Sequence, residues 1–505
     1  MSSESSEGTI FYNTTYFTNT MEDKITQDRY EKLAALEKAG INAFPHRFET
    51  THHAKDVKRE FDKIGQAPSD THVSVAGRIM LHRSMGKLIF TQLQDRTGRI
   101  QVLFSQKDTQ QFDHLKNIEM GDIIGVRGAV FRTKTGEITV RADNYELLAK
   151  GLKPMPEKYH GVKDTELRYR KRYLDLLYNE ESKEAFLNRA KIIRELRSFL
   201  DNQGFIEVDT PILQPMYGGA AARPFVTHHN ALDMQLYLRI SDELYLKRLI
   251  IGGLERVYEI CRNFRNEGID TTHNPEFTMV EWYQAYADYN TMMAQAEELL
   301  ARMTQAVHGK LFFTFADNTI QMKPPFRRLK MVDAIKEHAK LDVENMSEQE
   351  ILLECRNRKI DVPQQSWGHA VLALFEEYAE KKLIQPTFII DYPWETSPLT
   401  KKHRKDDRYV ERFELFINGW EIANAYSELS DPRDQRMRFE KQAEDAKKGD
   451  DEAHPMDEEF LEAMEYGMPP TGGIGIGIDR VCMLLTTNES IRDVILFPTL
   501  RPDER

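Results

Sequence analysis

Five short stretches in which apolar residues alternate with polar ones follow each other closely between residues 72 and 146. Glycines lie between them or near their ends, and the pattern predicts strands at about 73–79, 88–93, 100–104, 123–131 and 137–145. Five short strands in about 75 residues are what a small closed barrel of the OB type requires. This window therefore predicts a five-stranded OB-type β-barrel.

The sequence on both sides of that window has different patterns from the barrel. We expect residues 1–26 to be a disordered tail, and residues 27–150 to form one domain in which a helix at 27–39 precedes the barrel. Two prolines and two glycines in 151–165 indicate a linker. Beyond it, runs of strands with inserted helices predict an α+β domain over 166–505, built on an antiparallel sheet flanked by helices, with a helical insertion at about 330–385.

Composition excludes several classes of protein. The formal charge of −12 argues against a nucleic acid covering the whole surface, but residues 71–150 carry 12 Lys and Arg against 8 Asp and Glu. The three cysteines include no C-x-x-C pair, which disfavours a disulfide framework or a structural zinc site and fits a reducing compartment. No apolar run is long enough to span a membrane, and residues 1–20 resemble neither a transit peptide nor a secretion signal. We therefore expect a cytoplasmic protein.

The segment 262–283 contains the densest group of polar residues in a strand context, and its pattern predicts a hairpin with a long tip. Arg265 and Glu267 are two positions apart, so on a strand they share one face. A guanidinium group can bind phosphate or carboxylate oxygens in a bidentate manner. The alternative is a solvated face of salt bridges.

A second group lies at 412–428, where Asn418-Gly419 predicts a tight turn between two strands. Counting outward from this turn places Glu414 diagonal to Glu421 and on the same face. Two carboxylates this close suit Mg²⁺ shared with substrate phosphates. The alternative is a pair of exposed glutamates at a sheet edge.

In a third segment, glycine and isoleucine alternate from Gly473 to Ile478. This predicts a strand with an apolar face and a bare face that a flat ligand or a phosphate can approach, rather than a dinucleotide fingerprint. We expect Asp479 to cap the helix that follows, and Arg480 to lie beside the bare face.

Together, the three groups resemble the signature motifs of class II aminoacyl-tRNA synthetases. Residues 204–211 are similar to motif 1, Phe264-Arg265-Asn266-Glu267 to motif 2, and the segment from Gly475 to Arg480 to motif 3. The closer resemblance is to class II lysyl-tRNA synthetases, carried by 218–225, 243–248, 262–290, 424–428 and 492–498, and it runs from about residue 27 to the C-terminus. It implies an OB-fold anticodon-binding domain, a catalytic domain that activates L-lysine with ATP and transfers it to lysine tRNA, Mg²⁺ as cofactor, and a homodimer.

The resemblance also implies roles for individual residues. Arg265 would contact the ATP α-phosphate and the lysine carboxylate, and Arg480 the γ-phosphate; these two are the expected catalytic residues. The remaining nucleotide-binding residues would be Glu267, His273, Asn274, Phe277 and Gly477, with Glu414 and Glu421 as Mg²⁺ ligands. Lysine would be bound by Gly219, Glu243, Arg265, Glu281, Tyr283, Asn424, Tyr426 and Glu428, and the anticodon by Arg78, Phe90 and Gln101.

Two other functions share this architecture. One is a synthetase for aspartate or asparagine, although the acidic and aromatic set Glu428, Tyr283 and Tyr426 favours a substrate with a terminal amine. The other is a non-catalytic OB-fold nucleic-acid binder with a degenerate second domain, which would require loss of Arg265, Arg480 or the two glutamates. For Phe90, the alternative is a phenylalanine of the barrel core.

Overall fold

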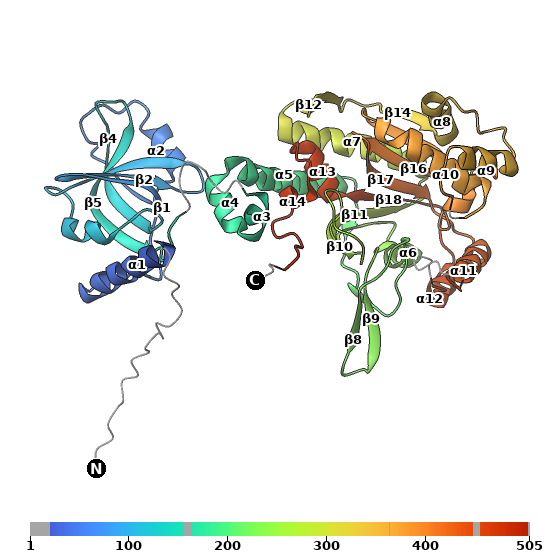
Figure 1. Ribbon diagram of the computed structural model, residues 1–505, viewed down its shortest axis with the longest axis horizontal. Coiled ribbons are helices and arrows are strands. Elements are labelled where there is room, and N and C mark those ends of the chain that lie inside the picture. The colour runs from blue at the N-terminus through green and yellow to red at the C-terminus, as the bar shows by residue number, and fades with distance from the viewer. Residues whose placement is uncertain (1–20, 156–163, 363, 448–454, 503–505) are drawn as a thin grey trace, which may run out of the picture. The chain divides into compact units, whose positions relative to one another are not determined.

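The computed structural model describes residues 21–155, 164–362, 364–447 and 455–502 (Figure 1). The chain divides into two compact units, residues 1–161 and 162–505, which are described separately. The elements of the first unit are α1 (Met21–Lys38), α2 (Ala54–Glu60), β1 (His72–Met85), β2 (Leu88–Gln94), β3 (Arg99–Ser105), the 3₁₀ helix η1 (Phe112–Asn117), β4 (Ile123–Arg132) and β5 (Ile138–Ala149).

The five strands of the first unit close into a ring in the order β1-β2-β3-β5-β4, with β1 also paired to β4. All pairs are antiparallel except β3 with β5, as expected for the predicted fold. The inward-facing side chains, among them Val75, Val102 and Phe104, form one buried core. Helix α1 begins at Met21, six residues before the expected start, so residues 21–26 are helical; the expected tail at 1–20 and most of the expected linker lie outside the described residues.

The second unit is built on an eight-stranded sheet in the order β14-β15-β16-β17-β18-β11-β10-β6. The six inner strands are antiparallel, as predicted, but both edge strands pair in parallel, so the sheet is mixed. The strands are β6 (Ile206–Glu207), β10 (Arg256–Phe264), β11 (Glu276–Ala285), β14 (Arg327–Lys330), β15 (Thr387–Pro393), β16 (Tyr409–Ile417), β17 (Trp420–Ser427) and β18 (Thr471–Gly477).

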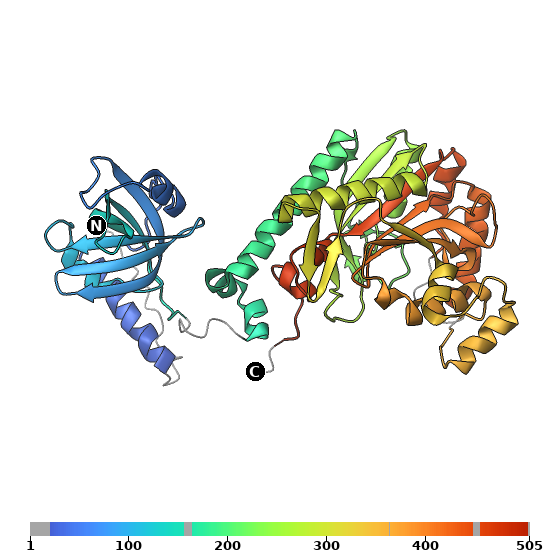
Figure 2. The same cartoon turned by 90° about the horizontal axis from the view of Figure 1, so that it is seen from above.

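Helices cover the apolar face of this sheet. Figure 2 shows the long helices α5 (Glu180–Asn202) and α7 (Tyr289–His308) side by side, and α13 (Ile478–Leu485) joins them in the core. Ile474 and Ile476 of β18 point into this core with Trp282 of β11. The alternation along each strand leaves the opposite face for the site.

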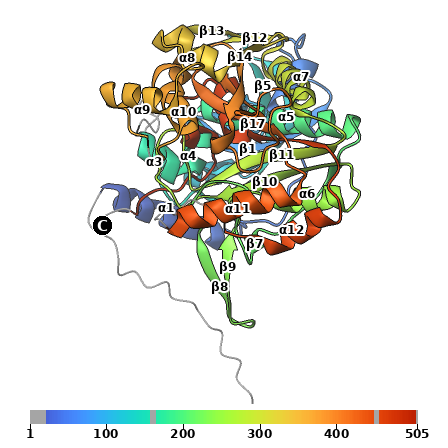
Figure 3. The same cartoon turned by 90° about the vertical axis from the view of Figure 1, so that its right-hand side faces the viewer.

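The remaining elements surround that opposite face. Helices α8 (Met331–Ala339), α9 (Glu348–Asn357) and α10 (Trp367–Tyr378), with η2 (Glu380–Lys382), form a helical layer with its own core where the insertion is expected. Figure 3 shows α11 (Pro432–Lys447) and α12 (Glu458–Glu465) next to each other; α12 also contacts α6 (Glu243–Ile251).

The smaller elements are α3 (Thr165–Arg170), α4 (Arg172–Tyr178), η3 (Trp394–Thr396), α14 (Ile491–Val494), the hairpin β12 (Phe312–Phe315) with β13 (Asn318–Gln321), and the sheet of β7 (Leu213–Gln214), β8 (Val226–His229) and β9 (Met234–Leu238). The β8–β9 hairpin projects from the unit (Figure 1). Among the described residues, no helix is long and apolar enough to cross a membrane.

Candidate active site

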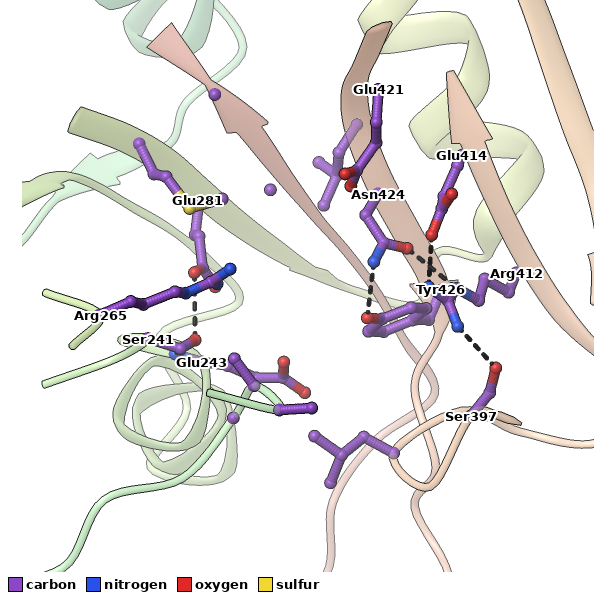
Figure 4. A pocket seen from close by; sticks show the side chains of 18 of the residues that line it. Ser241, Glu243, Arg265, Glu281, Ser397, Arg412, Glu414, Glu421, Asn424 and Tyr426 are labelled. Atoms are coloured by element: carbon purple, nitrogen blue, oxygen red, sulfur yellow. Dashed lines mark hydrogen bonds and ion pairs between the residues drawn. The ribbon is translucent and has the colours of Figure 1, made fainter. Parts of the chain in front are cut away.

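A cavity of about 630 Å³ opens on the face of the large sheet that the core helices leave free. Almost every residue expected in the nucleotide and lysine sites lines it, and Figure 4 shows the labelled side chains on its two sides. The expected residues in its wall are Gly219, Glu243, Arg265, Glu267, His273, Asn274, Phe277, Glu281, Tyr283, Glu414, Glu421, Asn424, Tyr426, Gly477 and Arg480. Glu428 is the exception, because it is buried next to the wall rather than in it.

The floor of the cavity consists of rows that cross the sheet, and a glycine of β18 lies at the middle of two of them. Gly475 lies between Glu281 and Asn424, and Gly473 lies between Tyr283 and Tyr426. The predicted bare face of β18 therefore exists as a strip along Gly473 and Gly475, here called the bare strip, and polar side chains lie on both sides of it. A methyl group on Gly473 would clash with the Glu428 carboxylate and the Tyr283 ring, so only glycine fits there.

A β-bulge between Leu415 and Phe416 sets which side chains of β17 reach the cavity. Phe416 pairs with Glu421 as predicted, but Leu415 pairs with Ala423, so Ile422 is the extra residue. Without the bulge, Glu421 and Asn424 would point to opposite faces. With the bulge, Glu421 and Asn424 both line the cavity. Glu414 and Glu421 lie on the same face, as expected, but the turn alone does not predict the strand register that places them there.

Arg265 and Arg480, the two expected catalytic arginines, both line the cavity. Arg480 Nη1 donates to the Glu421 carbonyl oxygen at 2.8 Å and lies 3.2 Å from its carboxylate, while Nη2 lies 3.3 Å from His273 Nε2. The Arg265 guanidinium lies over the Phe277 ring, 5.1 Å from its centroid, and its buried Nε has no hydrogen-bond partner among the described residues. Two guanidinium groups in one cavity provide an anion site suited to phosphate and carboxylate oxygens.

The Asn274 side chain is held by two hydrogen bonds to backbone groups. Its Nδ2 donates to the Glu276 carbonyl oxygen at 2.6 Å, and its Oδ1 accepts a hydrogen bond from the Thr499 backbone at 3.3 Å. The side chain therefore ties the loop before β11 to the C-terminal segment, and its nucleotide-binding role stays a prediction.

Glu414 and Glu421, the two expected Mg²⁺ ligands, both line the cavity, and their metal-binding role stays a prediction. Burial raises the pKa of Glu414 to about 7; the charge of Glu421 acts in the same direction, and Arg412 acts against it. A divalent cation would relieve the repulsion between these two carboxylates. Two carboxylates suit a Mg²⁺ that also takes ligands from substrate phosphates and water.

Glu243 and Glu281 are buried and line the cavity, on the same side as Arg265 in Figure 4. Ser241 Oγ donates to Glu281 Oε1 at 3.2 Å and accepts a hydrogen bond from the Glu243 backbone at 3.1 Å. Gly219, with φ of +85°, passes so close that a methyl group on it would lie 2.8 Å from Ser241 Oγ. Burial raises the pKa of Glu281 well above its ordinary range, and Asp242 adds to the effect. Such a site favours a cationic group that would neutralise these carboxyl groups.

Glu428, 1% exposed, lies at the far limit of the bare strip, where its backbone donates to the Thr471 carbonyl oxygen. Its Oε2 is 2.5 Å from Lys247 Nζ of α6, and the same ammonium is 2.5 Å from Glu243 Oε1. Burial raises the pKa of Glu428 to about 8, while Lys247 acts to lower it.

Comparisons with known proteins agree with this geometry. A family model described as tRNA synthetases class II (D, K and N) matches residues 164–501, and one described as OB-fold nucleic acid binding domain matches 73–148. A lysine–tRNA ligase from Pelotomaculum thermopropionicum is 52% identical over 489 residues, which cover 95% of this chain and 96% of the relative. Lysine–tRNA ligases from Carboxydothermus hydrogenoformans and Clostridium novyi are each 50% identical, with 95% of this chain covered and 98% and 94% of the relatives. The chain belongs to the lysine–tRNA ligase family.

Three residues that the sequence did not predict contact the expected site residues in this member of the family. Arg412 donates to Asn424 Oδ1 at 3.1 Å and to Glu414 Oε1 at 2.5 Å. Its spacing of two from Glu414 on a strand was a usable signal. Tyr392 donates to the other oxygen of Glu414 at 2.8 Å, and Lys247 joins two carboxylates; neither has a local signature in the sequence.

The expected role of Asp479 was wrong. Gly477 is the N-cap of α13 and makes no side-chain cap bond. Asp479 instead accepts a hydrogen bond from the Thr278 backbone at 2.7 Å and pairs with Arg189 of α5 at 2.5 Å. A capping carboxylate and a carboxylate that joins two elements have the same sequence signature, and the burial of this site selects the second.

The OB-fold domain of this family member presents the three residues expected to bind the anticodon on β1, β2 and β3. Phe90 is half-buried and lies outside the core cluster, which excludes the core alternative. Gln101 lies on β3 diagonal to Phe90 and donates to Thr139 Oγ1 at 2.8 Å. Arg78 donates to the Gly121 carbonyl oxygen at 2.7 Å, and Arg83 is paired with Phe90 across β1 and β2.

Proposed function

We infer that this family member is itself a lysine–tRNA ligase, which activates L-lysine with ATP and then transfers the lysyl group to the 3′ end of lysine tRNA. The observation that carries this inference is one cavity lined by guanidinium groups and by buried carboxyl groups, with the buried Glu428 carboxyl group next to its wall. A diamino acid has a carboxylate and two ammonium groups, and this arrangement of charges complements them.

In the first step, a lysine carboxylate oxygen attacks the α-phosphorus of ATP, and the bond to the bridging oxygen breaks to release pyrophosphate. This chain needs no nucleophile of its own, because the task is to bring two anions together and to balance their charge. Arg265 is the group proposed to hold both reactants, and Arg480 to hold the far phosphate. Mg²⁺ bound by Glu414 and Glu421 would further neutralise the phosphates.

In the second step, a ribose hydroxyl of the terminal tRNA nucleotide attacks the lysyl carbonyl carbon, and AMP leaves. Asn424 is proposed to orient the lysine carboxyl group, since Arg412 and Tyr426 hold its amide. Glu243, Glu281 and the Gly219 backbone would bind the α-ammonium, and Glu428, Tyr283 and Tyr426 the rest of the side chain.

The aspartate and asparagine alternative finds little support in these charges. An aspartate side chain would need a free cation near Glu428, and the Lys247 ammonium there already contacts Glu243 and Glu428. A degenerate relic is disfavoured because Arg265, Arg480, Glu414 and Glu421 all line one cavity.

ATP–pyrophosphate exchange with each amino acid in turn tests the proposal. We expect exchange that depends on lysine. Exchange with aspartate instead would contradict the choice of substrate, and exchange with none would favour the relic.

We also propose that the protein is a cytoplasmic homodimer that binds lysine tRNA through its OB-fold domain. Free, buried cysteines support a reducing compartment. Exposed apolar side chains around the motif 1 segment, including Ile206, Ile212 and Leu213, support a partner surface there. Sedimentation equilibrium should give twice the chain mass of 58.9 kDa.

A further inference from the structure

Lys247 of α6 is buried completely and has no counterpart among the expected site residues. Its ammonium contacts Glu243, which begins the same helix, and Glu428, which follows β17. One cation therefore joins the residue proposed to bind the α-ammonium of the substrate to the residue proposed to bind its ε-ammonium.

The two oxygens of Glu428 have different surroundings. Neither buried oxygen accepts a hydrogen bond from any described residue, but Oε2 forms an ion pair with Lys247, which leaves Oε1 as the oxygen on the side of Gly473. A side chain on Gly473, which lines the cavity, would collide with Oε1, so this oxygen lies at the bare strip. A buried oxygen without a donor is unfavourable, and a donor supplied by a ligand would satisfy it.

The local charge also leaves room for added cations. Asp242, Glu243, Glu281 and Glu428 are all buried, and Lys247 is the ammonium that contacts two of them. A site with more carboxyl groups than resident cations fits a ligand that brings two ammonium groups.

We propose that Lys247 is a positioning residue for amino-acid selection, which holds the Glu428 carboxylate so that Oε1 is presented to the terminal ammonium of the substrate. This inference rests on the proposed function and adds the residue that sets its selectivity. The ligand it selects is a diamino acid, and an uncharged analogue of equal length, such as norleucine, is disfavoured.

Without Lys247, Glu428 and Glu243 would lose their shared countercharge and take up protons more readily. The charged and titratable groups that act on Glu428 are Lys247 and Glu243 from α6, Glu281 and Tyr283 from β11, and Tyr426 from β17; Asp242 acts on Tyr283 and Arg412 on Tyr426. Removing the ammonium that contacts Glu428 should therefore shift its titration toward higher pH.

The first test is Lys247→Met in the full-length protein, followed by ATP–pyrophosphate exchange with lysine and with norleucine. We expect the KM for lysine to rise by about 30-fold or more at neutral pH and the preference for lysine over norleucine to fall by a similar factor, with the KM for ATP changed by less than about threefold. The pH above which the lysine KM levels off should rise. A purely structural role would lower kcat for both substrates without moving this pH.

The second test compares Glu428→Gln with the double variant Lys247→Met/Glu428→Gln. The double variant also removes the carboxylate that Lys247→Met leaves unpaired, so it can be measured even if Lys247→Met alone folds poorly. If Lys247 acts chiefly through Glu428, Lys247→Met should raise the lysine KM far less in the Glu428→Gln background than in the wild-type protein, with the remaining effect due to its contact with Glu243. Losses that multiply would overturn the proposal.

Lys150→Met is a matched control, because Lys150 in the OB-fold domain is equally buried and pairs with Asp122 at 2.9 Å and Glu119 at 3.2 Å. It should leave the lysine KM unchanged. An unchanged lysine KM in Lys247→Met would contradict this inference alone, whereas a wild-type protein without lysine-dependent exchange would contradict the proposed function.

Discussion

Burial disfavours ionisation of the Glu428 carboxyl group, but its proposed role requires the ionised form. Burial raises its pKa to about 8, partly offset by Lys247. Below that pH the group is mostly protonated and neutral, so it attracts an ammonium weakly. Above it, the carboxylate can pair with the substrate ε-ammonium, which stays charged until about pH 10.4.

We therefore expect the lysine KM of the wild-type protein to fall as the pH rises to about 8 and then to level off. Glu428→Gln should abolish this pH dependence and raise the lysine KM by roughly 30- to 1,000-fold, because truncating a buried charge pair costs about 2–4 kcal/mol. Exchange kinetics at several pH values give both results, with ATP saturation as the internal control. An equal rise in the ATP KM would show that the lysine site is misplaced.

At the scale of the element, the bare face of β18 is what lets the carboxylate and aromatic side chains of neighbouring strands meet. Gly473→Ala would force Glu428 and Tyr283 apart, whereas Gly475→Ala would place its methyl 3.1 Å from the flexible end of Met279. We expect the first substitution to reduce lysine-dependent exchange by at least about 100-fold and the second to reduce it far less. Comparable losses in the two variants, measured with matched thermal unfolding, would contradict this account.

The sequence predicted this strand and its bare face because glycine and isoleucine alternate in a pattern that has one structural solution. The hairpin at Asn418-Gly419 was predicted for a similar reason, since its turn residues are specific. The bulge that follows was not, because the extra residue, Ile422, fits an unbroken strand equally well.

Lys247 and the edge strand β14 show a second reason why the sequence alone did not predict every element of the fold and the site. Lys247 has the sequence environment of a surface lysine, and only the fold brings Glu428, which follows β17, next to it. Strand β14 reads Arg-Arg-Leu-Lys and joins the sheet through its parallel pairing with β15, without an apolar pattern of its own. In both cases the deciding contact is distant in sequence.

At the scale of the whole molecule, the two units have separate cores and separate proposed tasks. Phe90→Ala should slow the charging of tRNA by about 10- to 100-fold, because base stacking on an aromatic ring contributes about 1–3 kcal/mol. Lysine-dependent exchange should stay at the wild-type level, and a parallel loss of both activities would mean that Phe90 is structural.

A fragment starting at residue 164 should likewise keep lysine-dependent exchange, since every residue that lines the cavity belongs to the second unit. Its charging of tRNA should be strongly reduced because the proposed anticodon-binding residues are missing. Exchange and charging assays on the purified fragment test this, with circular dichroism as the check on folding. Loss of exchange in a folded fragment would contradict the separation of tasks.

The raised pKa of Glu428 should affect the heat measured when lysine binds. If lysine binds only after this carboxyl group has released its proton, then each binding event near neutral pH passes up to one proton to the buffer. The heat of lysine binding should therefore differ between a buffer with a large ionisation enthalpy and one with a small ionisation enthalpy, and that difference should vanish above about pH 9. The amino-acid site would then be a proton donor to its surroundings each time it fills.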